Sequence, residues 1–284
     1  MSFVILNGEL IKREQATIDI EDRGYQFGDG VYEVVRVYNG KLFTGDEHLQ
    51  RLEKSAASIG MQIPFPVEQL KDQLVQLIDK NKLTLGTVYL QFTRGISPRK
   101  HPFPPENVKT TFVAYTREAG RPEEKMLQGV KAIITEDIRW LRCDIKSLNL
   151  LGNLLANQKA AEAGCDEAVL HRDGLVTEGS HSNISIVKGG KVQTHPANQF
   201  ILNGISRKVM LAICEREGIS VIEETFTVDE LLKADEVFLT GTTVEVMPIV
   251  EIDGKQVGDG QPGQLTRKLQ EWFKLEIEAQ CGSL

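Results

Sequence analysis

The stretch WLRCDIKSLNLLGN, residues 140–153, places one lysine, Lys146, between two apolar segments of the chain. The segment at residues 130–134 predicts a strand, and the segment at residues 150–163 predicts a helix. A lysine held between such segments is partly desolvated, which lowers its pKa and favours its use as a nucleophile. Because most lysines are exposed, a solvated surface residue is the alternative interpretation at this point.

A carboxylate, Glu178, stands in the stretch VTEGSHSN, residues 176–183, among hydroxyl and amide side chains that predict a turn. Such a carboxylate can simply cap the turn. Paired with a Schiff-base lysine it indicates a sharper role, because a cofactor ring that acts as an electron sink needs a nearby anion to keep its ring nitrogen protonated.

Six motifs together are similar to those of a known family. CDIKSLNLLGN and TEGSHSN, with NGIS at residues 203–206 and TGTT at residues 240–243, resemble fold-type IV pyridoxal-phosphate enzymes. GDGVYEVVRVYNG at residues 28–40 and SPRKHPFP at residues 97–104 narrow the resemblance to D-amino-acid aminotransferases. The resemblance extends from about residue 3 to about residue 275.

The resemblance implies the fold and the reaction. The expected fold is a two-domain α/β (α+β) architecture, with a smaller N-terminal α/β domain and a larger C-terminal domain whose sheet is β-barrel-like. The expected reaction is reversible, ping-pong amino transfer from D-amino acids such as D-alanine and D-glutamate to 2-oxo acids such as pyruvate and 2-oxoglutarate. Pyridoxal 5'-phosphate alternates with its pyridoxamine form, and the enzyme is expected to be a homodimer.

The resemblance also implies roles for individual residues. Lys146 matches the lysine that is linked to the cofactor and then moves a proton between substrate Cα and cofactor C4′. Glu178 matches the carboxylate at the ring nitrogen. The other cofactor-binding residues implied are Arg51, Leu202, Ile205, Ser206 and Thr242. The substrate carboxylate is expected to be bound by Tyr32, Arg99 and His101, the last two serving the site of the neighbouring subunit.

Taken singly, several of these residues have ordinary structural interpretations. Arg51 fits the solvated face of a helix, residues 203–206 fit a turn with a serine cap, and Thr242 fits the turn after a strand. Tyr32 fits a half-buried strand position. Two positions depart from the family pattern, because His181 stands where a small hydroxyl residue is expected and Ser206 replaces a threonine. The serine keeps a hydroxyl, and a solvent-facing histidine is the default expectation at 181.

Length and charge restrict the function classes. With 284 residues the chain is expected to form two domains, at 1–118 and 125–284, joined by a charged linker at 119–124. The net charge of -7 and pI near 5.4 argue against a nucleic-acid partner. No secretory signal or membrane-length apolar run is visible, so a soluble, cytoplasmic protein without a membrane partner is expected.

Cysteines and histidines give no support for a metal or a disulfide framework. The cysteines, which are expected to be reduced, are Cys143, Cys165, Cys214 and Cys281. The histidines outside the motifs, His48, His171 and His195, lack metal-ligand spacing, so no metal is expected.

Two classes of alternative function remain. A branched-chain aminotransferase or an aminodeoxychorismate lyase of the same fold would lack the trap formed by residues 99–101. A non-catalytic protein that binds pyridoxal phosphate is the second class, and the presence of both Lys146 and Glu178 argues against it.

Periodicity predicts the elements. Helices are expected at residues 46–59, 67–80, 150–163, 205–217, 228–233 and 264–278. Strands are expected at residues 3–6, 9–11, 17–20, 31–38, 88–93, 109–115, 130–134, 167–171, 184–187, 220–224, 236–239 and 244–250. Residues 23–30 are expected to form a tight loop, and the prolines of residues 94–105 a rigid one.

Overall fold

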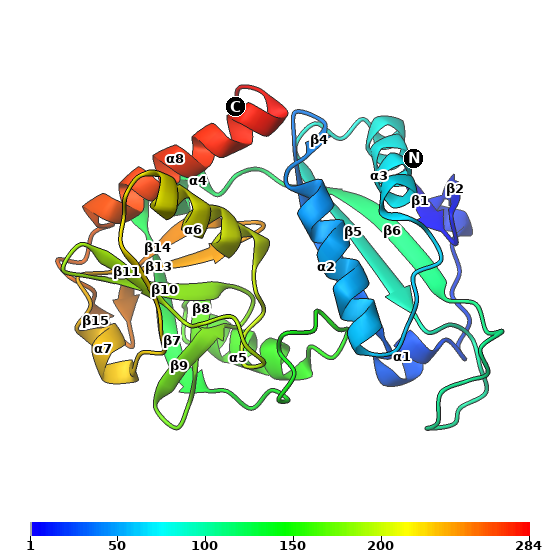
Figure 1. Ribbon diagram of the computed structural model, residues 1–284, viewed down its shortest axis with the longest axis horizontal. Coiled ribbons are helices and arrows are strands. Elements are labelled where there is room, and N and C mark those ends of the chain that lie inside the picture. The colour runs from blue at the N-terminus through cyan, green and yellow to red at the C-terminus, as the bar shows by residue number, and fades with distance from the viewer. Residues whose placement is uncertain (1) are drawn as a thin grey trace. The chain divides into compact units, whose positions relative to one another are not determined.

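The computed structural model describes residues 2–284, which form two compact units (Figure 1). The first unit contains the described residues up to Gly120, with Ile145–Asn149 and Ile277–Leu284. The second contains Arg121–Asp144 and Leu150–Glu276. The segment that carries Lys146 is therefore part of the first unit. The continuous domains at 1–118 and 125–284 stay a prediction.

The first unit is built on a six-stranded antiparallel sheet of order β2-β1-β6-β5-β3-β4. Two helices, α2 (Gly45–Ser58) and α3 (Val67–Asn81), pack on it, and a 3-10 turn, η1, lies at Arg13–Gln15. The strands are β1 (Phe3–Leu6), β2 (Glu9–Lys12), β3 (Gly30–Tyr38), β4 (Lys41–Leu42), β5 (Gly86–Thr93) and β6 (Thr111–Glu118).

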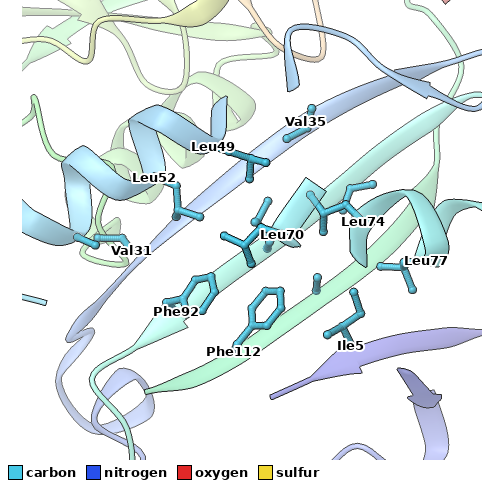
Figure 2. Packing of buried hydrophobic residues seen from close by; sticks show 14 of the residues in the cluster. Ile5, Val31, Val35, Leu49, Leu52, Leu70, Leu74, Leu77, Phe92 and Phe112 are labelled. Atoms are coloured by element: carbon cyan, nitrogen blue, oxygen red, sulfur yellow. The ribbon is translucent and has the colours of Figure 1, made fainter. Parts of the chain in front are cut away.

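The core of the first unit lies between this sheet and the two helices (Figure 2). Each helix presents buried apolar residues at spacings of three and four residues, which fall on one helical face: Leu49, Leu52 and Ala56 on α2, and Leu70, Leu74 and Leu77 on α3. These leucines pack against side chains of the sheet, including a stacked pair of phenylalanines from β5 and β6. The residues labelled in Figure 2 are Ile5, Val31, Val35, Leu49, Leu52, Leu70, Leu74, Leu77, Phe92 and Phe112.

Alternation along β3 decides where its polar residues point. Side chains of a strand alternate between the two faces of its sheet, so Glu33 shares the face of Val31 and Val35, where α2 packs. Tyr32 lies on the opposite face. A carboxylate is thereby placed under a helix, where it needs a charged or hydrogen-bonding partner.

The second unit is built on a mixed sheet of order β12-β11-β10-β13-β14-β7-β8-β9, with β15 paired to β14. Three pairs are parallel: β7 with β8, β7 with β14, and β11 with β12. The strands are β7 (Val130–Glu136), β8 (Glu167–Arg172), β9 (Leu175–Gly179), β10 (Asn183–Lys188), β11 (Lys191–Thr194), β12 (Val221–Glu223), β13 (Glu236–Gly241), β14 (Glu245–Ile252) and β15 (Lys255–Gln256).

The sheet of the second unit curls back on itself. Strands β9 and β10 stand apart in the strand order, yet residues 180–182 join them directly, and the Gly179 N–H donates to Ser182 O at 2.7 Å. The predicted α/β class with a barrel-like sheet is confirmed. The remaining helices of the chain are α1 (Arg23–Phe27), α4 (Glu123–Gln128), α5 (Leu151–Glu162), α6 (Ile205–Arg216), α7 (Val228–Leu232) and α8 (Gln264–Cys281).

Three local predictions were wrong. Residues 17–20 form no strand, and Ile18 and Ile20 are exposed, because the folded chain brings no neighbouring strand to them. Residues 23–30 contain helix α1, which Asp22 caps through the Gly24 N–H and which ends at Gly28 with φ 66°. Glu178 lies inside strand β9 rather than in a turn.

Three other features bear on function. All four cysteines are free thiols. Within residues 2–284, no helix combines the length and apolar character that crossing a bilayer requires. The same residues include no group of three or more His, Cys, Asp or Glu side chains arranged to hold a metal ion.

Candidate functional site

Lys146 lies at the edge of the first unit's sheet, beside the beginning of β3. The Tyr32 N–H donates to Lys146 O at 3.1 Å, and the Lys146 N–H donates to Ser55 Oγ of α2 at 3.2 Å. The half-buried Lys146 side chain brings Nζ to 4.2 Å from the centroid of the Tyr32 ring. This cation–π contact places the Lys146 side chain over the face of the Tyr32 ring.

Gly30 explains how this segment approaches β3. A Cβ at position 30 would lie 2.4 Å from Phe92 O on one side and 2.8 Å from Leu148 Cδ1 on the other. The Leu148 N–H donates to Gly30 O at 3.0 Å, which continues the pairing next to Lys146. Because Gly30 has no side chain, strand β5 and the segment that contains Leu148 can both pack closely against β3, the strand that carries Tyr32.

Arg51 of α2 pairs with Glu33 and does not lie on a solvated face of the helix. Arg51 Nε and Nη2 donate to Glu33 Oε1 and Oε2 at 2.6 and 2.9 Å, and His48 Nδ1 lies 2.7 Å from Oε2. The Arg51 side chain is 9% exposed and Glu33 is fully buried. Burial raises the pKa of Glu33, but Arg51 and His48 outweigh it and hold that pKa well below its usual range. Burial lowers the pKa of His48, although Glu33 opposes this shift.

Arg99 and His101 lie on an exposed loop that is tied to α1. The guanidinium of Arg99 lies 4.3 Å from the Phe27 ring centroid, and the His101 ring lies 5.8 Å from the same ring. Buried Arg23 donates through Nη1 to Lys100 O at 2.7 Å and to Pro102 O at 3.4 Å. The backbone of the loop is therefore fixed while both side chains stay open to solvent.

Within residues 2–284, the ring contacts of Tyr32 are made with residues outside this loop. Its ring stacks on Tyr89 at 5.7 Å and lies under Lys146, and no hydrogen bond or ring contact joins it to Arg99 or His101. The three residues expected to bind a substrate carboxylate are thus not brought together by hydrogen bonds or ring contacts within one subunit.

Glu178 is the centre of a buried polar cluster in the second unit, which we call the Glu178 cluster: Asp137, Arg139, Glu178, Asn183 and Leu202. Glu178 Oε1 accepts from Arg139 Nη1 at 2.5 Å. Its Oε2 accepts from Asn183 Nδ2 at 3.0 Å and from the Leu202 N–H at 3.1 Å. Burial raises the pKa of Glu178 to about 7, although Arg139 opposes the rise.

Arg139 is itself fixed by Asp137 in the same cluster. Its Nε and Nη2 donate to Asp137 Oδ1 and Oδ2, each at 2.8 Å. Arg172 and Thr177 also donate to Asp137 Oδ2, at 3.1 and 3.0 Å. Burial raises the pKa of Asp137, but the hydrogen bonds from Arg139 and Arg172 reverse the effect and bring it to about 2.

The start of α6 approaches the Glu178 cluster through Asn183. Asn183 Nδ2 donates to Leu202 O at 2.8 Å, and a Cβ at Gly204, the N-cap residue, would lie 2.2 Å from Asn183 Oδ1. Ile205 and Ser206, both buried, form the first turn, and no N-cap side chain accepts from its N–H groups. A helix start with such N–H groups and a hydroxyl is suited to an anion.

Thr242 stands in the turn that follows β13, where it is half-buried. Two residues earlier, Thr240 pairs with Asn183 across the sheet, so their side chains share one face. The Thr240 hydroxyl is buried and has no hydrogen-bond partner within residues 2–284. An orphaned hydroxyl on this face is a polar group that a ligand beside Glu178 would satisfy.

His181 interacts with a second buried carboxylate, Glu167. His181 Nδ1 lies 3.3 Å from Glu167 Oε2 and 3.1 Å from Ser180 Oγ, and its side chain is 52% exposed. Ser180 and Ser182 donate through their hydroxyls to Glu167 at 2.5 and 2.7 Å. The histidine that departs from the family pattern is therefore partly solvated and lies at the end of a serine–glutamate network.

Sequence reasoning missed Glu33, Asp137 and Arg139. No motif marks them, although the alternation of β3 places Glu33 on the helix-facing side. Arg139 reaches Glu178 across 39 positions of sequence, a separation that leaves no local signal.

Comparison with known proteins gives a consistent family. A family model described as "Amino-transferase class IV" matches residues 30–252. The chain is 53% identical to a D-alanine aminotransferase of Listeria monocytogenes, over 99% of this chain and 98% of that protein.

Solved structures agree. The branched-chain amino acid aminotransferase of Escherichia coli matches with a TM-score of 0.90 and 27% identity, over 96% of this chain and 93% of that one. A branched-chain amino acid aminotransferase of T.th., solved with pyridoxamine 5'-phosphate, matches with a TM-score of 0.89 and 28% identity. That match covers 100% of this chain and 95% of that one. The predicted fold-type IV architecture is confirmed by these neighbours.

Proposed function

The chain belongs to the class IV aminotransferases, and from this membership we propose that it is a pyridoxal-phosphate-dependent transaminase that moves amino groups from D-amino acids to 2-oxo acids. D-alanine and D-glutamate are the proposed donors, and pyruvate and 2-oxoglutarate the acceptors. The greater identity to a D-alanine aminotransferase, 53%, than to the branched-chain enzymes, 27–28%, supports this choice. The family-specific loop at residues 99–101 supports it as well.

The state of Glu178 is the observation that carries the proposal. A carboxylate has about four lone-pair directions, and protein donors fill three of them here. The direction left on a buried carboxylate is suited to the protonated ring nitrogen of pyridoxal phosphate, which requires an anion beside it. The orphaned Thr240 hydroxyl on the Asn183 face fits the same ligand.

The remaining cofactor residues are assigned by chemistry. Pyridoxal phosphate, when bound, supplies an electron sink and a carbonyl that condenses with amines. We assign the phosphate to the Arg51 guanidinium, the N–H groups at Ile205 and Ser206 and the Thr242 hydroxyl, because these are the donor types that bind phosphate. Leu202 lies against the ring. Glu33 sets the direction of the Arg51 guanidinium, and Asn183 ties Glu178 to the start of α6.

Lys146 and Glu178 are the proposed catalytic residues. The Lys146 amine would hold the cofactor, and the same amine would move a proton from substrate Cα to cofactor C4′ as general base and then general acid. The Tyr32 ring, whose centroid lies 4.2 Å from Nζ, orients the Lys146 side chain. An ionised Glu178 would accept a hydrogen bond from the protonated ring nitrogen and would thereby favour the build-up of negative charge on Cα.

The substrate carboxylate is assigned to Tyr32 of one subunit together with Arg99 and His101 of its partner. The separation of Tyr32 from the loop within one chain supports this division. The proposed homodimer would also cover apolar side chains that a single chain leaves exposed. The exposed residues on and just before α5 are Ile138, Trp140, Leu141, Leu151, Leu154 and Leu155.

We also propose that the chain divides into domains at 1–118 and 125–284 and that the protein is cytoplasmic. Four free cysteines support a reducing compartment, and the acidic charge supports the absence of nucleic-acid partners.

The proposed function is tested by a coupled assay with D-alanine and 2-oxoglutarate, run in parallel with L-alanine and L-leucine. We expect pyruvate from D-alanine alone, and no turnover from Lys146→Ala. Turnover of L-leucine instead would favour a branched-chain enzyme. A protein that binds pyridoxal phosphate but turns over none of these substrates would support the non-catalytic alternative.

A further inference from the structure

Arg139 makes the cationic contact to Glu178, yet no step of the proposed function uses it. The contact between Arg139 Nη1 and Glu178 Oε1 is 2.5 Å, shorter than the two contacts at Oε2. A charge-assisted hydrogen bond of this kind is about twice as strong as a neutral one. Arg139 therefore has a large influence on how strongly Glu178 holds a proton.

The geometry points to a specific role. We propose that Arg139 is a positioning residue that weakens the affinity of Glu178 for a proton, so that the proton shared by Glu178 and the cofactor ring nitrogen stays on the ring. The proposal rests on the proposed function for the identity of the ring. One proton can lie in either of two places. It can be on the ring nitrogen, with Glu178 as a carboxylate, or on Glu178, with the ring neutral. We assign to Arg139 the role of favouring the first state.

The two oxygens of Glu178 differ in the acceptor directions that they have left. Oε2 accepts from Asn183 and Leu202, and so both of its directions are filled. Oε1 accepts from Arg139 and has one direction left. The ring nitrogen would therefore donate to Oε1, the oxygen that Arg139 also contacts, and that oxygen would accept from both donors.

The proton balance at Glu178 depends on burial and on Arg139 together. Burial alone makes Glu178 a stronger base, since an ionised carboxylate is disfavoured away from water. Its pKa of about 7, with Arg139 in place, would rise further without the guanidinium. Glu178 would then compete with the ring nitrogen for the proton, and a neutral ring is a poorer electron sink.

The guanidinium of Arg139 is held rigidly. Asp137 accepts two hydrogen bonds from Nε and Nη2 of Arg139, which fixes the plane of the guanidinium and directs Nη1 to Glu178. Phe200 O accepts a further hydrogen bond from Nη2 at 3.3 Å. An arginine presents this fork and a lysine does not.

The other charged groups near Glu178 do not replace Arg139. Asp137 is negative and raises the pKa of Glu178, and Arg172 donates to Asp137 and to backbone carbonyls of residues 139 and 140. Cys143 lies in the same region, where burial raises its pKa to about 11, so it is a neutral thiol. The net charge of Asp137, Arg139, Glu178 and Arg172, all ionised, is zero (two acidic and two basic groups), and loss of Arg139 leaves it negative.

The first test titrates Glu178 in the apoprotein, where no cofactor contributes. Difference infrared spectroscopy follows its protonated carboxyl band, which is assigned by its loss in Glu178→Gln. In Arg139→Gln we expect the pKa of Glu178 to rise by about 1 to 3 pH units, the usual effect of an adjacent opposite charge. Arg142→Gln is the matched control, because Arg142 is half exposed and pairs with Asp144 rather than with Glu178. It should leave the titration unchanged.

Arg139→Lys keeps the experiment decisive if Arg139→Gln does not fold. It retains the charge but loses the fork, so we expect an intermediate rise in the pKa of Glu178. Circular dichroism establishes that each variant is folded before it is titrated. A folded Arg139→Lys or Arg139→Gln protein whose Glu178 titrates as in the wild type would overturn the proposal.

The second test observes the ring directly. Cofactor labelled with 15N in its ring is bound to wild type and to Arg139→Lys, and the 15N chemical shift distinguishes a protonated from a neutral ring. We expect a protonated ring in the wild type and a shift toward the neutral value in the variant. A protonated ring in both, over the whole pH range of stability, contradicts the proposal.

The experiments distinguish failure of this inference from failure of the proposed function. If the wild type does not transaminate any amino acid, the function fails while the apoprotein titration still decides the role of Arg139. If the wild type transaminates D-alanine and the titration of Glu178 is indifferent to Arg139, the function stands and this inference is wrong.

Discussion

Glu33 and Arg51 form a buried, two-point ion pair that joins strand β3 to helix α2. The two hydrogen bonds, 2.6 and 2.9 Å long, fix the plane of the guanidinium. Both partners are nearly or fully withdrawn from solvent. The pair therefore fixes the orientation of the Arg51 guanidinium, which we assign to the cofactor phosphate.

We expect Glu33→Gln to lower the free energy of unfolding by about 3 to 5 kcal/mol, because breaking a buried ion pair leaves the other charge uncompensated. The affinity for pyridoxal phosphate should fall as well, since Arg51 loses its orientation. Thermal unfolding and cofactor titration measure the two effects. Glu53→Gln on the exposed side of α2 is the control. Unchanged cofactor affinity in a folded Glu33→Gln protein would remove Arg51 from the phosphate site.

The raised pKa of Glu178 predicts a pH-dependent stability of the apoprotein. An acid whose pKa is higher in the folded than in the unfolded state binds more protons when folded, so its contribution to stability is lost as pH rises. For Glu178 the window runs from its ordinary value of 4.5 to about 7. Relative to Glu178→Gln, the wild type should lose up to about 1.4 kcal/mol per pH unit there. The assignment is wrong if the free energies of unfolding of the two proteins change equally with pH across this window.

Arg99→Ala should raise KM for D-alanine by about 30-fold or more, corresponding to the roughly 2 to 5 kcal/mol lost when one partner of a desolvated charge pair is removed. The cofactor affinity should not change. Lys109→Ala, at an exposed position near the end of the same loop, is the matched control and should leave KM near the wild-type value. An equal effect of both substitutions would indicate a disturbed loop rather than a lost cation.

The partner-subunit arrangement has a separate check. When Arg99→Ala and Lys146→Ala chains are unfolded and refolded together, one site of each mixed dimer carries both lesions and the other carries neither. Random pairing should then restore about a quarter of the wild-type sites. Mixed dimers that form but remain inactive would place the loop in the site of its own subunit.

The double substitution Leu154→Glu and Leu155→Glu should convert the dimer to monomers. These leucines of α5 are 61% and 46% exposed in the single chain, and carboxylates in an apolar interface disfavour association. Sedimentation velocity measures the change. Leu127→Glu, at a 65% exposed position of α4, is the control. A wild type that sediments as a monomer, or a double variant that remains dimeric, would contradict the proposed interface.

The fold was predictable where a pattern is local. The helices expected at 46–59 and 67–80 are α2 and α3, because apolar residues at spacings of three and four residues define a buried face. Residues 17–20 have a composition typical of a strand. A strand must also pair with a neighbouring strand, and the fold of the rest of the chain determines whether one lies beside it. The strand that contains Glu178 was not predicted, because its polar residues are typical of a turn. Pairing with β8 stabilises these residues as a strand.

The site was predictable only where the resemblance supplied motifs. Lys146 and Glu178 stand in such motifs, whereas Arg139 and Glu33 have no motif and act through distant partners. A hydrogen bond between residues 39 positions apart depends on the paths of β7, β8 and β9, which composition and periodicity do not specify. The residues that tune a site are thus harder to predict from sequence than those that perform its chemistry.

The central claim, that a D-amino acid gives its amino group to this enzyme and a 2-oxo acid then removes it, is tested most directly by the half-reaction. The purified holoenzyme is mixed with 15N-labelled D-alanine and no 2-oxo acid, quenched rapidly and analysed by mass spectrometry. We predict one equivalent of pyruvate per subunit, with the 15N retained by the enzyme until 2-oxoglutarate releases it as labelled glutamate. Labelled L-alanine should give no pyruvate under the same conditions. Absence of pyruvate from D-alanine, or release of the 15N as ammonia without 2-oxoglutarate, would contradict the account.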